Sequence, residues 1–351
     1  MATKNKKKIF FIMSTNDYSG AEAVNFSIIE NLKEKYDFYW VSKKGKINNF
    51  LKEANIRWIE IKSLSISEIK RIVKENKPDI LHATDFKASV ICALANTKVF
   101  LIEHLHNNAP WLKKIGINSC AFLYAGLKAN KILTVSESIE KEYIFSRYIR
   151  NKIECIDNPI SRKKILSKVT NLNCEKIYDI CCVARLTRQK NPYKFLNILS
   201  EIKKEKKDIK AVWVGDGELK DNILRKAIEL NLNNNIVFVG FQKNPYIYMA
   251  SSKIFMLTSN WEGYGLVAFE ALTLGLPCVV SNVGGLPNVV DNECGKLCNS
   301  EEEFIKEINT LLKNNTIYNE KMKKAKKKAV KIENLNTYIE KINKMYKESQ
   351  R

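Results

Sequence analysis

Short apolar runs, many of them rich in Val and Ile, alternate with longer amphipathic stretches along most of the chain. In the first half these runs lie at residues 7–13, 36–42, 56–62, 79–84, 98–106, 131–137 and 153–157. Continuous apolar strands separated by helices are typical of a parallel sheet that is covered on both faces. The first half is therefore predicted to form a doubly wound α/β domain.

The same alternation starts again after a polar stretch at residues 160–176. The second set of apolar runs lies at residues 178–186, 209–217, 235–241, 253–260 and 277–285. A chain of 351 residues is long enough for two domains. We therefore expect an α/β fold of two Rossmann-like domains, residues 1–165 and 166–332, which face each other across a cleft.

Residues 333–351 are predicted to form a final helix with an apolar stripe, because apolar residues recur there every three or four positions. The stripe has to pack on a domain. Packing back onto the first domain and packing on the second both remain open from the pattern alone.

The charge balance indicates which kinds of binding partner to expect. The chain has 59 Lys and Arg against 38 Asp and Glu, a net charge of +21. This excess favours an anionic partner such as nucleic acid, lipid headgroups or a phosphorylated ligand. The sequence has no helix-turn-helix, RNP-like or zinc-finger pattern, so nucleic acid is not expected.

The sequence also argues against a zinc protein and against a membrane-spanning or secreted protein. The cysteines show no paired CxxC spacing and no cluster with histidine, which argues against a zinc site. No segment approaches the roughly 20 apolar residues of a membrane span, and the amino terminus lacks a signal-peptide core. We expect a cytoplasmic protein that touches a membrane, if at all, from the inner face of the plasma membrane.

The segment SNWEGYGLVAFEAL, residues 259–272, carries the strongest chemical pattern. A predicted strand ends in a loop with Gly263 and Gly265, and a helix begins near Gly265. The free N–H groups of a helix start bind phosphate, whereas carboxylates accept hydrogen bonds from hydroxyl groups. The pattern therefore indicates a nucleotide sugar, with Glu270 at the ribose and Glu262 at the hexose.

Two cations follow the first strand of the second domain. Arg185 comes directly after the apolar run CCVA, and Lys190 lies five residues further on. Cations at this position can neutralise a diphosphate leaving group and the charge that develops as a glycosidic bond breaks.

Taken together, these segments resemble the retaining glycosyltransferases of family 4, which have the GT-B fold. The resemblance is carried by VARLTRQKN, VGDGEL, VFVGFQ and the E-x7-E run that continues into GLPCVVSNVGGLPNVV. In the first half, YSGAEAVNFSIIENL, KPDILHATD, ILTVSES and IDNPIS resemble the family more loosely. For the final helix, the resemblance implies a return to the first domain.

The resemblance implies roles for single residues. Arg185 and Lys190 match the pair that holds the donor diphosphate, Glu270 the glutamate at the ribose, and Glu262 the glutamate at the donor sugar. Gly20 matches the second glycine of an amino-terminal GG loop that faces the diphosphate. Ser19 stands where the first glycine would be, a departure from the family pattern. The remaining donor-binding positions are Gly263, Tyr264, Gly265, Leu266 and Val267.

The family also has a cleft histidine after a strand of the first domain, for which HLHNNAP offers His104 and His106. We favour His106 because it lies nearer the predicted end of the strand. His82 is expected to have a structural or supporting role. The predicted catalytic set is then His106, Glu262, Arg185 and Lys190.

No D-x-D sequence occurs in the chain, and the resemblance implies transfer without a metal or another cofactor. Arg185, Lys190 and helix amides would take the place of a divalent cation. The implied mechanism is front-face transfer with retention, in which the departing phosphate oxygen helps to deprotonate the incoming hydroxyl. UDP is the expected carrier because it is the commonest in the family.

The expected acceptor is a glycan, a glycolipid or a lipid-linked sugar in the synthesis of surface polysaccharide or glycoconjugate. Two alternatives remain: a non-catalytic basic protein of the same fold that binds membrane or polyanion, and a GT-B nucleotide-sugar epimerase. For contact with an anionic membrane the candidates are Trp111 and lysines of the first domain, namely Lys4, Lys6, Lys7, Lys8, Lys113, Lys114, Lys128 and Lys131.

Overall fold

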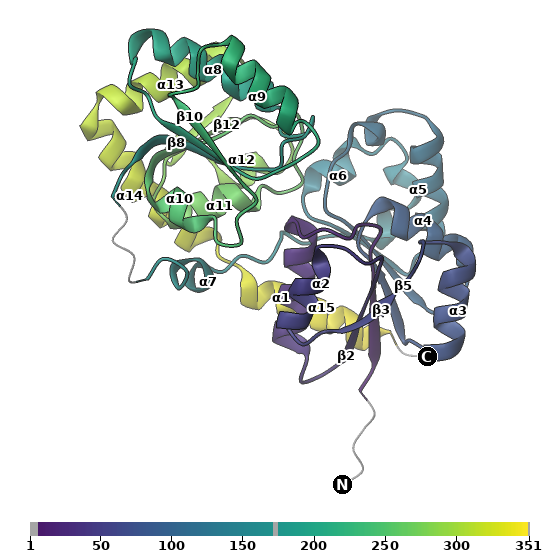
Figure 1. The fold of residues 1–351 in the computed structure, drawn as a ribbon. Helices are drawn as coiled ribbons and strands as arrows, with labels where there is room; N and C mark the ends of the chain where they lie inside the picture. Colours follow the sequence, from purple (N-terminus) through teal and green to yellow (C-terminus); the bar gives the residue numbers. More distant parts are fainter. Residues whose placement is uncertain (1–5, 171–174, 350–351) are drawn as a thin grey trace. The chain divides into compact units, whose positions relative to one another are not determined.

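The computed structural model describes residues 6–170 and 175–349, which form two compact units (Figure 1). Unit 1 comprises Met1–Pro159 and Asn334–Arg351, and unit 2 comprises Ile160–Glu333. Each unit has its own parallel sheet with helices on it. Two doubly wound α/β units were predicted from the alternation of apolar runs and helices, and this fold class is confirmed.

The sheet of unit 1 has seven strands in the order β3-β2-β1-β4-β5-β6-β7, and all neighbours are parallel. The strands are β1 (Lys8–Ile12), β2 (Asp37–Ser42), β3 (Arg57–Glu60), β4 (Ile80–Ala83), β5 (Phe100–Leu105), β6 (Lys131–Thr134) and β7 (Ile153–Cys155). The strand order reverses between β1 and β4. In open α/β sheets, ligands bind beside the carboxyl ends of the strands at such a reversal.

Unit 1 also contains α-helices and 3-10 turns. They are α1 (Gly20–Leu32), α2 (Ile47–Glu53), α3 (Ile66–Asn76), α4 (Phe86–Ala95), α5 (Ile117–Lys128), α6 (Glu137–Glu142), α15 (Leu335–Glu348) and the 3-10 turns η1 (Pro110–Lys113), η2 (Ser146–Tyr148) and η3 (Arg150–Lys152). Polar caps mark several starts: the Asp85 side chain accepts from the Ala88 amide at the start of α4.

The last helix of the chain, α15, is part of unit 1. Its apolar stripe, Tyr338, Ile342, Met345 and Tyr346, is buried. The Lys7 ammonium group donates hydrogen bonds to backbone carbonyls at the end of this helix, at 3.0 Å to Tyr346 and 2.9 Å to Ser349. A cation at the carboxyl end of a helix is stabilising, so the amino-terminal strand β1 and the last helix hold each other in place.

The sheet of unit 2 has six strands in the order β10-β9-β8-β11-β12-β13, again all parallel. They are β8 (Tyr178–Val183), β9 (Ala211–Val214), β10 (Ile236–Gly240), β11 (Ser252–Leu257), β12 (Cys278–Ser281) and β13 (Gly295–Cys298). The helices are α7 (Arg162–Leu166), α8 (Pro192–Glu205), α9 (Lys220–Glu229), α10 (Tyr246–Ala250), α11 (Leu266–Thr273), α12 (Leu286–Val289), α13 (Glu301–Lys313) and α14 (Asn315–Ile332). Here the reversal lies between β8 and β11.

Among the described residues, no helix is both long enough and apolar enough to cross a membrane.

Candidate functional site

The candidate site of unit 2 lies where the strand order reverses. Strands β8 and β11 are neighbours, with Ile180 opposite Ile254. Arg185 and Lys190 lie in the loop that follows β8, and Glu262 lies in the loop that follows β11. The carboxyl ends of parallel neighbours meet at one edge of the sheet, so the topology brings the three predicted side chains to the same place.

Lys190 and Glu262 form an ion pair at this edge, between the lysine Nζ and the glutamate Oε1. Both side chains are largely enclosed. The Ser259 hydroxyl donates a second hydrogen bond to the same carboxylate oxygen, at 2.6 Å. A buried charge that loses its partner costs roughly 3–5 kcal/mol, so the pair holds the two loops together as well as presenting charge.

Arg185 contrasts with Lys190. Its side chain is exposed and forms no ion pair with any residue in 6–170 or 175–349. The backbone around it is fixed: the Leu186 amide donates to the Asp216 carbonyl at 3.0 Å, and the Trp213 indole donates to the Ala184 carbonyl at 2.9 Å. Arg185 is therefore a cation on a hydrogen-bonded loop, and no carboxylate of the described residues neutralises it.

The glycines of the VGDGEL stretch explain how this loop is held. Gly215 has φ +141°, and a Cβ there would lie 2.0 Å from the Ala184 carbonyl oxygen. At Gly217 a Cβ would lie 2.4 Å from the Leu186 carbonyl oxygen. Only glycine fits such a close backbone approach, so the loop after β9 supports the loop that carries Arg185.

Helix α11 starts at the same edge. Gly265 is its N-cap, with φ +91°, and a Cβ there would lie 2.5 Å from the Leu286 side chain. The first N–H groups of a helix have no intrahelical acceptor. Along α11, Leu266, Val267 and Glu270 are partly exposed, whereas the other positions are buried. These three share one helix face, which is the face that opens away from the core.

Glu270 is held by a residue that the sequence pattern does not reveal. The Tyr246 hydroxyl, from α10, donates to Glu270 Oε1 at 3.1 Å. Part of the glutamate reaches solvent, but burial of the carboxyl group raises its pKa to about 7, and the hydrogen bond from Tyr246 opposes this shift. Tyr246 is 24 positions away in the sequence and carries no motif, so only the tertiary structure identifies it.

In unit 1, Gly20 is the first residue of α1 and is exposed. Ser19, which departs from the family pattern, has an extended backbone with φ −143° that any residue adopts. Its amide and its hydroxyl both donate to Glu22 Oε2, at 2.9 and 2.5 Å, and the Thr15 hydroxyl donates to Oε1 at 2.6 Å. The serine therefore orders the turn before α1 without backbone strain.

All three histidines of the chain lie together in unit 1. His82 Nε2 is 3.2 Å from His104 Nδ1, and the rings of His104 and His106 are stacked with centroids 3.9 Å apart. His82 and His104 are fully buried, whereas His106, just after the end of β5, keeps part of its surface exposed. Of the two candidates for a ligand-facing histidine, only His106 has exposed surface, and both of its ring nitrogens are buried without a hydrogen-bond partner among the described residues.

The histidines are held neutral. Burial lowers the pKa of His82 to about 3, and the neighbouring His106 adds to the shift. Burial also lowers the pKa of His106 to about 3, against an opposing interaction with Asn158. For His104, burial and the two neighbouring rings keep the pKa well below its usual value. At neutral pH each ring therefore carries one proton and no charge.

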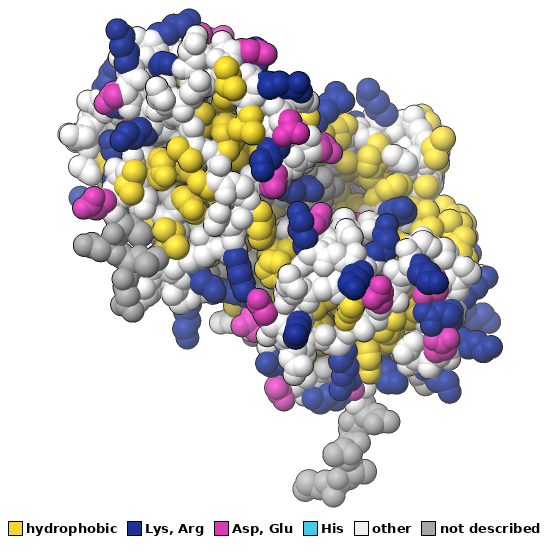
Figure 2. Space-filling view, viewed as in Figure 1, with side chains coloured by type: hydrophobic (Ala, Val, Ile, Leu, Met, Phe, Trp, Pro, Cys, Tyr) yellow, Lys and Arg dark blue, Asp and Glu magenta, His cyan; other side chains and the backbone are white. Residues whose placement is uncertain are grey.

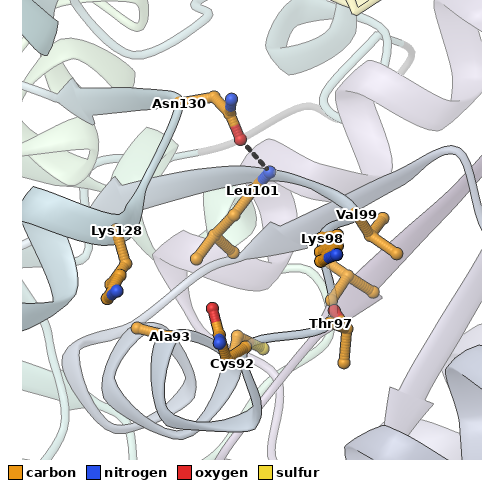
Figure 3. A pocket seen from close by; sticks show the side chains of 10 residues that line it. Cys92, Ala93, Thr97, Lys98, Val99, Leu101, Lys128 and Asn130 are labelled. Carbon is orange, nitrogen blue, oxygen red and sulfur yellow. Dashed lines mark hydrogen bonds between the residues drawn. The ribbon is translucent and has the colours of Figure 1, made fainter. Parts of the chain in front are cut away.

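A pocket of about 200 Å³ lies elsewhere in unit 1, where the amino end of β5 meets the ends of α4 and α5 (Figure 3). The side chain of Asn130 accepts from the Leu101 amide there, at 2.9 Å. None of the predicted site residues lines this pocket. In the described parts of the chain, no three His, Cys, Asp or Glu residues gather as a metal site would require.

Two family models match consecutive parts of the chain. The model described as "Glycosyltransferase Family 4" matches residues 20–164, and the model described as "Glycosyl transferases group 1" matches residues 164–329. Together they span both units.

Two curated relatives match over most of their length. A Campylobacter jejuni protein named N-acetylgalactosamine-N,N'-diacetylbacillosaminyl-diphospho-undecaprenol 4-alpha-N-acetylgalactosaminyltransferase is 25% identical over 88% of this chain and 91% of its own. An Escherichia coli protein named UDP-Gal:alpha-D-GlcNAc-diphosphoundecaprenol alpha-1,3-galactosyltransferase is 24% identical over 98% of both. Among solved structures, Anabaena HepE in complex with UDP and glucose superposes with a TM-score of 0.84 at 18% identity, over 97% of this chain and 100% of that one.

Proposed function

Since the chain belongs to the group 1 and family 4 glycosyltransferases, we propose that it transfers a hexose from a nucleotide sugar, with UDP as carrier, to a glycan, glycolipid or lipid-linked acceptor. The names of the two curated relatives, which include diphospho-undecaprenol substrates, support a lipid-linked acceptor in the synthesis of surface polysaccharide. The UDP complex of HepE supports the choice of nucleotide. The observation that carries the proposal is the meeting of Arg185, the Lys190–Glu262 pair and the start of α11 at one sheet edge.

In this proposal the donor diphosphate binds to the exposed Arg185 and to the amides of Gly265, Leu266 and Val267. A phosphate near Lys190 would interact with the same ammonium group that pairs with Glu262. The carboxylate of Glu262 is then free to accept from a sugar hydroxyl through its second oxygen. Positive charges that are already positioned at the leaving group stabilise the negative charge that develops there. They therefore lower the barrier to breaking the glycosidic bond.

Glu270 faces the same edge and would accept a hydrogen bond from a ribose hydroxyl. With a pKa of about 7, its carboxyl group is partly protonated at neutral pH. A ribose hydroxyl that donates to Glu270 favours the ionised form. Donor binding should therefore release a fraction of a proton near pH 7.

The proposed reaction is front-face transfer with retention. The bond between the anomeric carbon and the diphosphate oxygen breaks, a bond from the acceptor oxygen forms on the same face, and the acceptor proton passes to the departing phosphate oxygen. The leaving nucleoside diphosphate is neutralised by Arg185, Lys190 and helix amides, so the proposed reaction needs no metal. His106 stays neutral and orients the sugar or the acceptor through a hydrogen bond.

A lipid-linked acceptor implies contact with a membrane, for which one surface of unit 1 is suited. Ile115, in the loop before α5, and Ile117, the first residue of α5, are 72% and 89% exposed. Tyr124 and Leu127, also exposed, continue this surface along α5, seven and ten residues after Ile117. Figure 2 shows hydrophobic side chains gathered over this part of unit 1, with Lys and Arg side chains near them.

We call this the α5 surface: Ile115, Ile117, Tyr124 and Leu127, with the exposed Lys114 and Lys128 beside them in the sequence. An apolar patch bordered by cations fits an anionic lipid surface. The patch belongs to the segment that continues from His106. Of the other candidates, Lys7 is engaged by α15, Lys131 pairs with Glu348, and Lys4 lies outside the described residues.

The test of the transferase is a panel of UDP-, GDP- and ADP-sugars with release of free nucleotide as readout, with lipid extract as acceptor and EDTA present. We compare the wild type with Arg185→Ala, Glu262→Gln and Arg188→Ala. Arg188 is an exposed arginine three residues from Arg185 with no predicted role, so Arg188→Ala is the matched control. We expect one donor to be consumed, a loss of roughly 100-fold or more in kcat/KM for Arg185→Ala and Glu262→Gln, and little change for the control.

Other outcomes favour the alternatives. Absence of turnover with every donor, despite a folded wild type, supports the non-catalytic binding protein. Release of an isomerised nucleotide sugar without transfer supports the epimerase. Loss of activity in EDTA that Mg²⁺ or Mn²⁺ restores contradicts the metal-independent reaction.

A further inference from the structure

The proposed function leaves one buried polar chain of unit 1 without a role. The Tyr346 hydroxyl, on the last helix α15, is 2.8 Å from His82 Nδ1. The opposite nitrogen of His82 is 3.2 Å from His104 Nδ1, and His104 stacks on His106. Tyr346, His82 and His104 are all fully buried. The four side chains of Tyr346, His82, His104 and His106 thus form a continuous row from α15 to the end of β5.

The number of protons on these side chains limits the directions that their hydrogen bonds can take. A neutral imidazole carries one N–H and one bare nitrogen. Each contact in the chain needs one proton between its two atoms, so the hydrogen bonds must all run in the same direction. They run either from Tyr346 towards His104 or from His104 towards Tyr346.

The two directions differ in what they leave unpaired. If His104 donates to His82 and His82 donates to Tyr346, the Tyr346 hydroxyl has no acceptor among the described residues. If Tyr346 donates to His82 Nδ1, then His82 Nε2–H donates to His104 Nδ1, and every hydrogen bond in the chain is made. In this second direction His104 Nδ1 accepts, so the proton of His104 lies on Nε2, which has no acceptor among the described residues. Each direction thus leaves one buried polar hydrogen without an acceptor, and in either direction His82 and His104 have the same tautomer as each other.

We propose that the contact with Tyr346 holds His82 and His104 in one common tautomer and that the His104 ring, held in this way, orients His106 at the end of β5. Tyr346, His82 and His104 are then positioning residues, and α15 contributes to the site without touching the substrate. The link to catalysis rests on the proposed role of His106. That His82 and His104 share one tautomer follows from the contacts alone.

The experiment uses full-length protein labelled with ¹⁵N-histidine and purified through a tag without histidine. Because the sequence has three histidines, a multiple-bond ¹H–¹⁵N spectrum contains only three imidazole patterns. Substitution of each histidine by Gln assigns them. We expect the same pattern, either Nε2–H or Nδ1–H, for His82 and His104 at pH 7, and a different pattern at the two residues would overturn the proposal.

The chain offers a matched control on the same helix. Tyr338 is as deeply buried as Tyr346, but its hydroxyl has no hydrogen-bond partner in the described part of the chain. Tyr346→Phe and Tyr338→Phe therefore remove the same atom from α15, and only the first removes a hydrogen bond. We expect Tyr346→Phe to shift the patterns of His82, His104 and His106, whereas Tyr338→Phe leaves the nitrogen shifts of His82 and His104 in place.

The same two variants test the link to turnover. We expect kcat for nucleotide release to fall roughly tenfold in Tyr346→Phe with little change in the donor KM, because orientation rather than binding is lost. Tyr338→Phe should stay near the wild type. Equal spectra or equal kcat values for the two variants would overturn the positioning role. If the wild type consumes no donor, the proposed function fails, while the spectra still decide the tautomers.

Discussion

At the scale of single residues, Glu103 is the least satisfied charged group in unit 1. It lies on β5, its side chain is fully buried, and neither carboxylate oxygen has a hydrogen-bond partner among the described residues. Burial raises its pKa to about 8, although the charge of Lys152 opposes the shift. Alternation along the strand directs Glu103 away from the face of His104. The carboxyl group is therefore protonated at neutral pH.

Glu103→Gln should stabilise unit 1 in a pH-dependent way. A glutamate that ionises at about pH 4.5 when unfolded and at about 8 when folded stabilises the folded state least at high pH. The gain from Gln should thus be small near pH 4.5 and grow up to pH 8, to on the order of 4 kcal/mol. Urea denaturation at pH 5 and pH 8 measures it.

The matched control for this change is Glu34→Gln, at an exposed position of the same unit. It should change the unfolding free energy little at either pH. A gain for Glu103→Gln that is equal at pH 5 and pH 8 would contradict the buried, protonated carboxyl group.

At the scale of elements, the α5 surface makes a prediction about membranes. Ile115→Ser with Ile117→Ser should weaken sedimentation with phosphatidylcholine vesicles that contain 30% phosphatidylglycerol by roughly tenfold or more, because each buried isoleucine contributes about 1.5–3 kcal/mol. Binding of the wild type should fall when phosphatidylglycerol is left out or salt is raised.

The control for the vesicles changes two isoleucines of unit 2. Ile177 and Ile228 are 55% and 60% exposed and lie outside the α5 surface, so Ile177→Ser with Ile228→Ser should bind vesicles like the wild type. Equal loss in both double variants would argue against a specific surface. Self-association of the wild type that only the Ile115 and Ile117 changes abolish would assign the α5 surface to a second copy instead.

The sequence was most informative about elements that depend on local pattern. The apolar runs marked most strands of both sheets, because buried parallel strands are apolar on both faces. The short β13 was missed, since Gly295–Cys298 is only four residues long and includes Lys296. The glycines and the apolar run predicted a helix start near Gly265, and Gly265 is the N-cap of α11 with φ +91°.

The site was predictable as a set of residues but not as a set of contacts. The sequence pattern assigned Lys190 to the phosphate and Glu262 to the sugar, and did not predict that they pair with each other across 72 positions. The contacts of Tyr246 with Glu270 and of Tyr346 with His82 were equally hidden. A hydrogen bond between distant elements depends on how helices pack, and neither spacing nor composition records that packing.

At the scale of the whole molecule, α15 makes the two ends of the chain depend on each other. Truncation after Glu333 removes the buried side chains of α15, the partner of His82 and the acceptors of Lys7. We expect unit 1 to lose several kcal/mol of unfolding free energy, as is usual when several large core side chains are lost. Unit 2 should be affected much less, because α15 is not part of it.

Differential scanning calorimetry of the full chain and the truncated chain tests this prediction. The unit 1 transition should move to lower temperature and the unit 2 transition should stay. Removal of residues 350–351 alone, which leaves α15 intact, is the control. An unchanged unit 1 transition after truncation at Glu333 would contradict the assignment of α15 to unit 1.

The place of α15 at the end of the chain also matters while the protein is being made. A ribosome synthesises residues 1–159 long before residues 335–348. The first half therefore emerges with the apolar surface that α15 later covers still exposed. Unit 2 has all its strands and helices before that helix appears. The order of synthesis and the order of completion are therefore reversed: unit 2 can finish first, and the nascent first half keeps apolar surface open for chaperones until α15 has been synthesised.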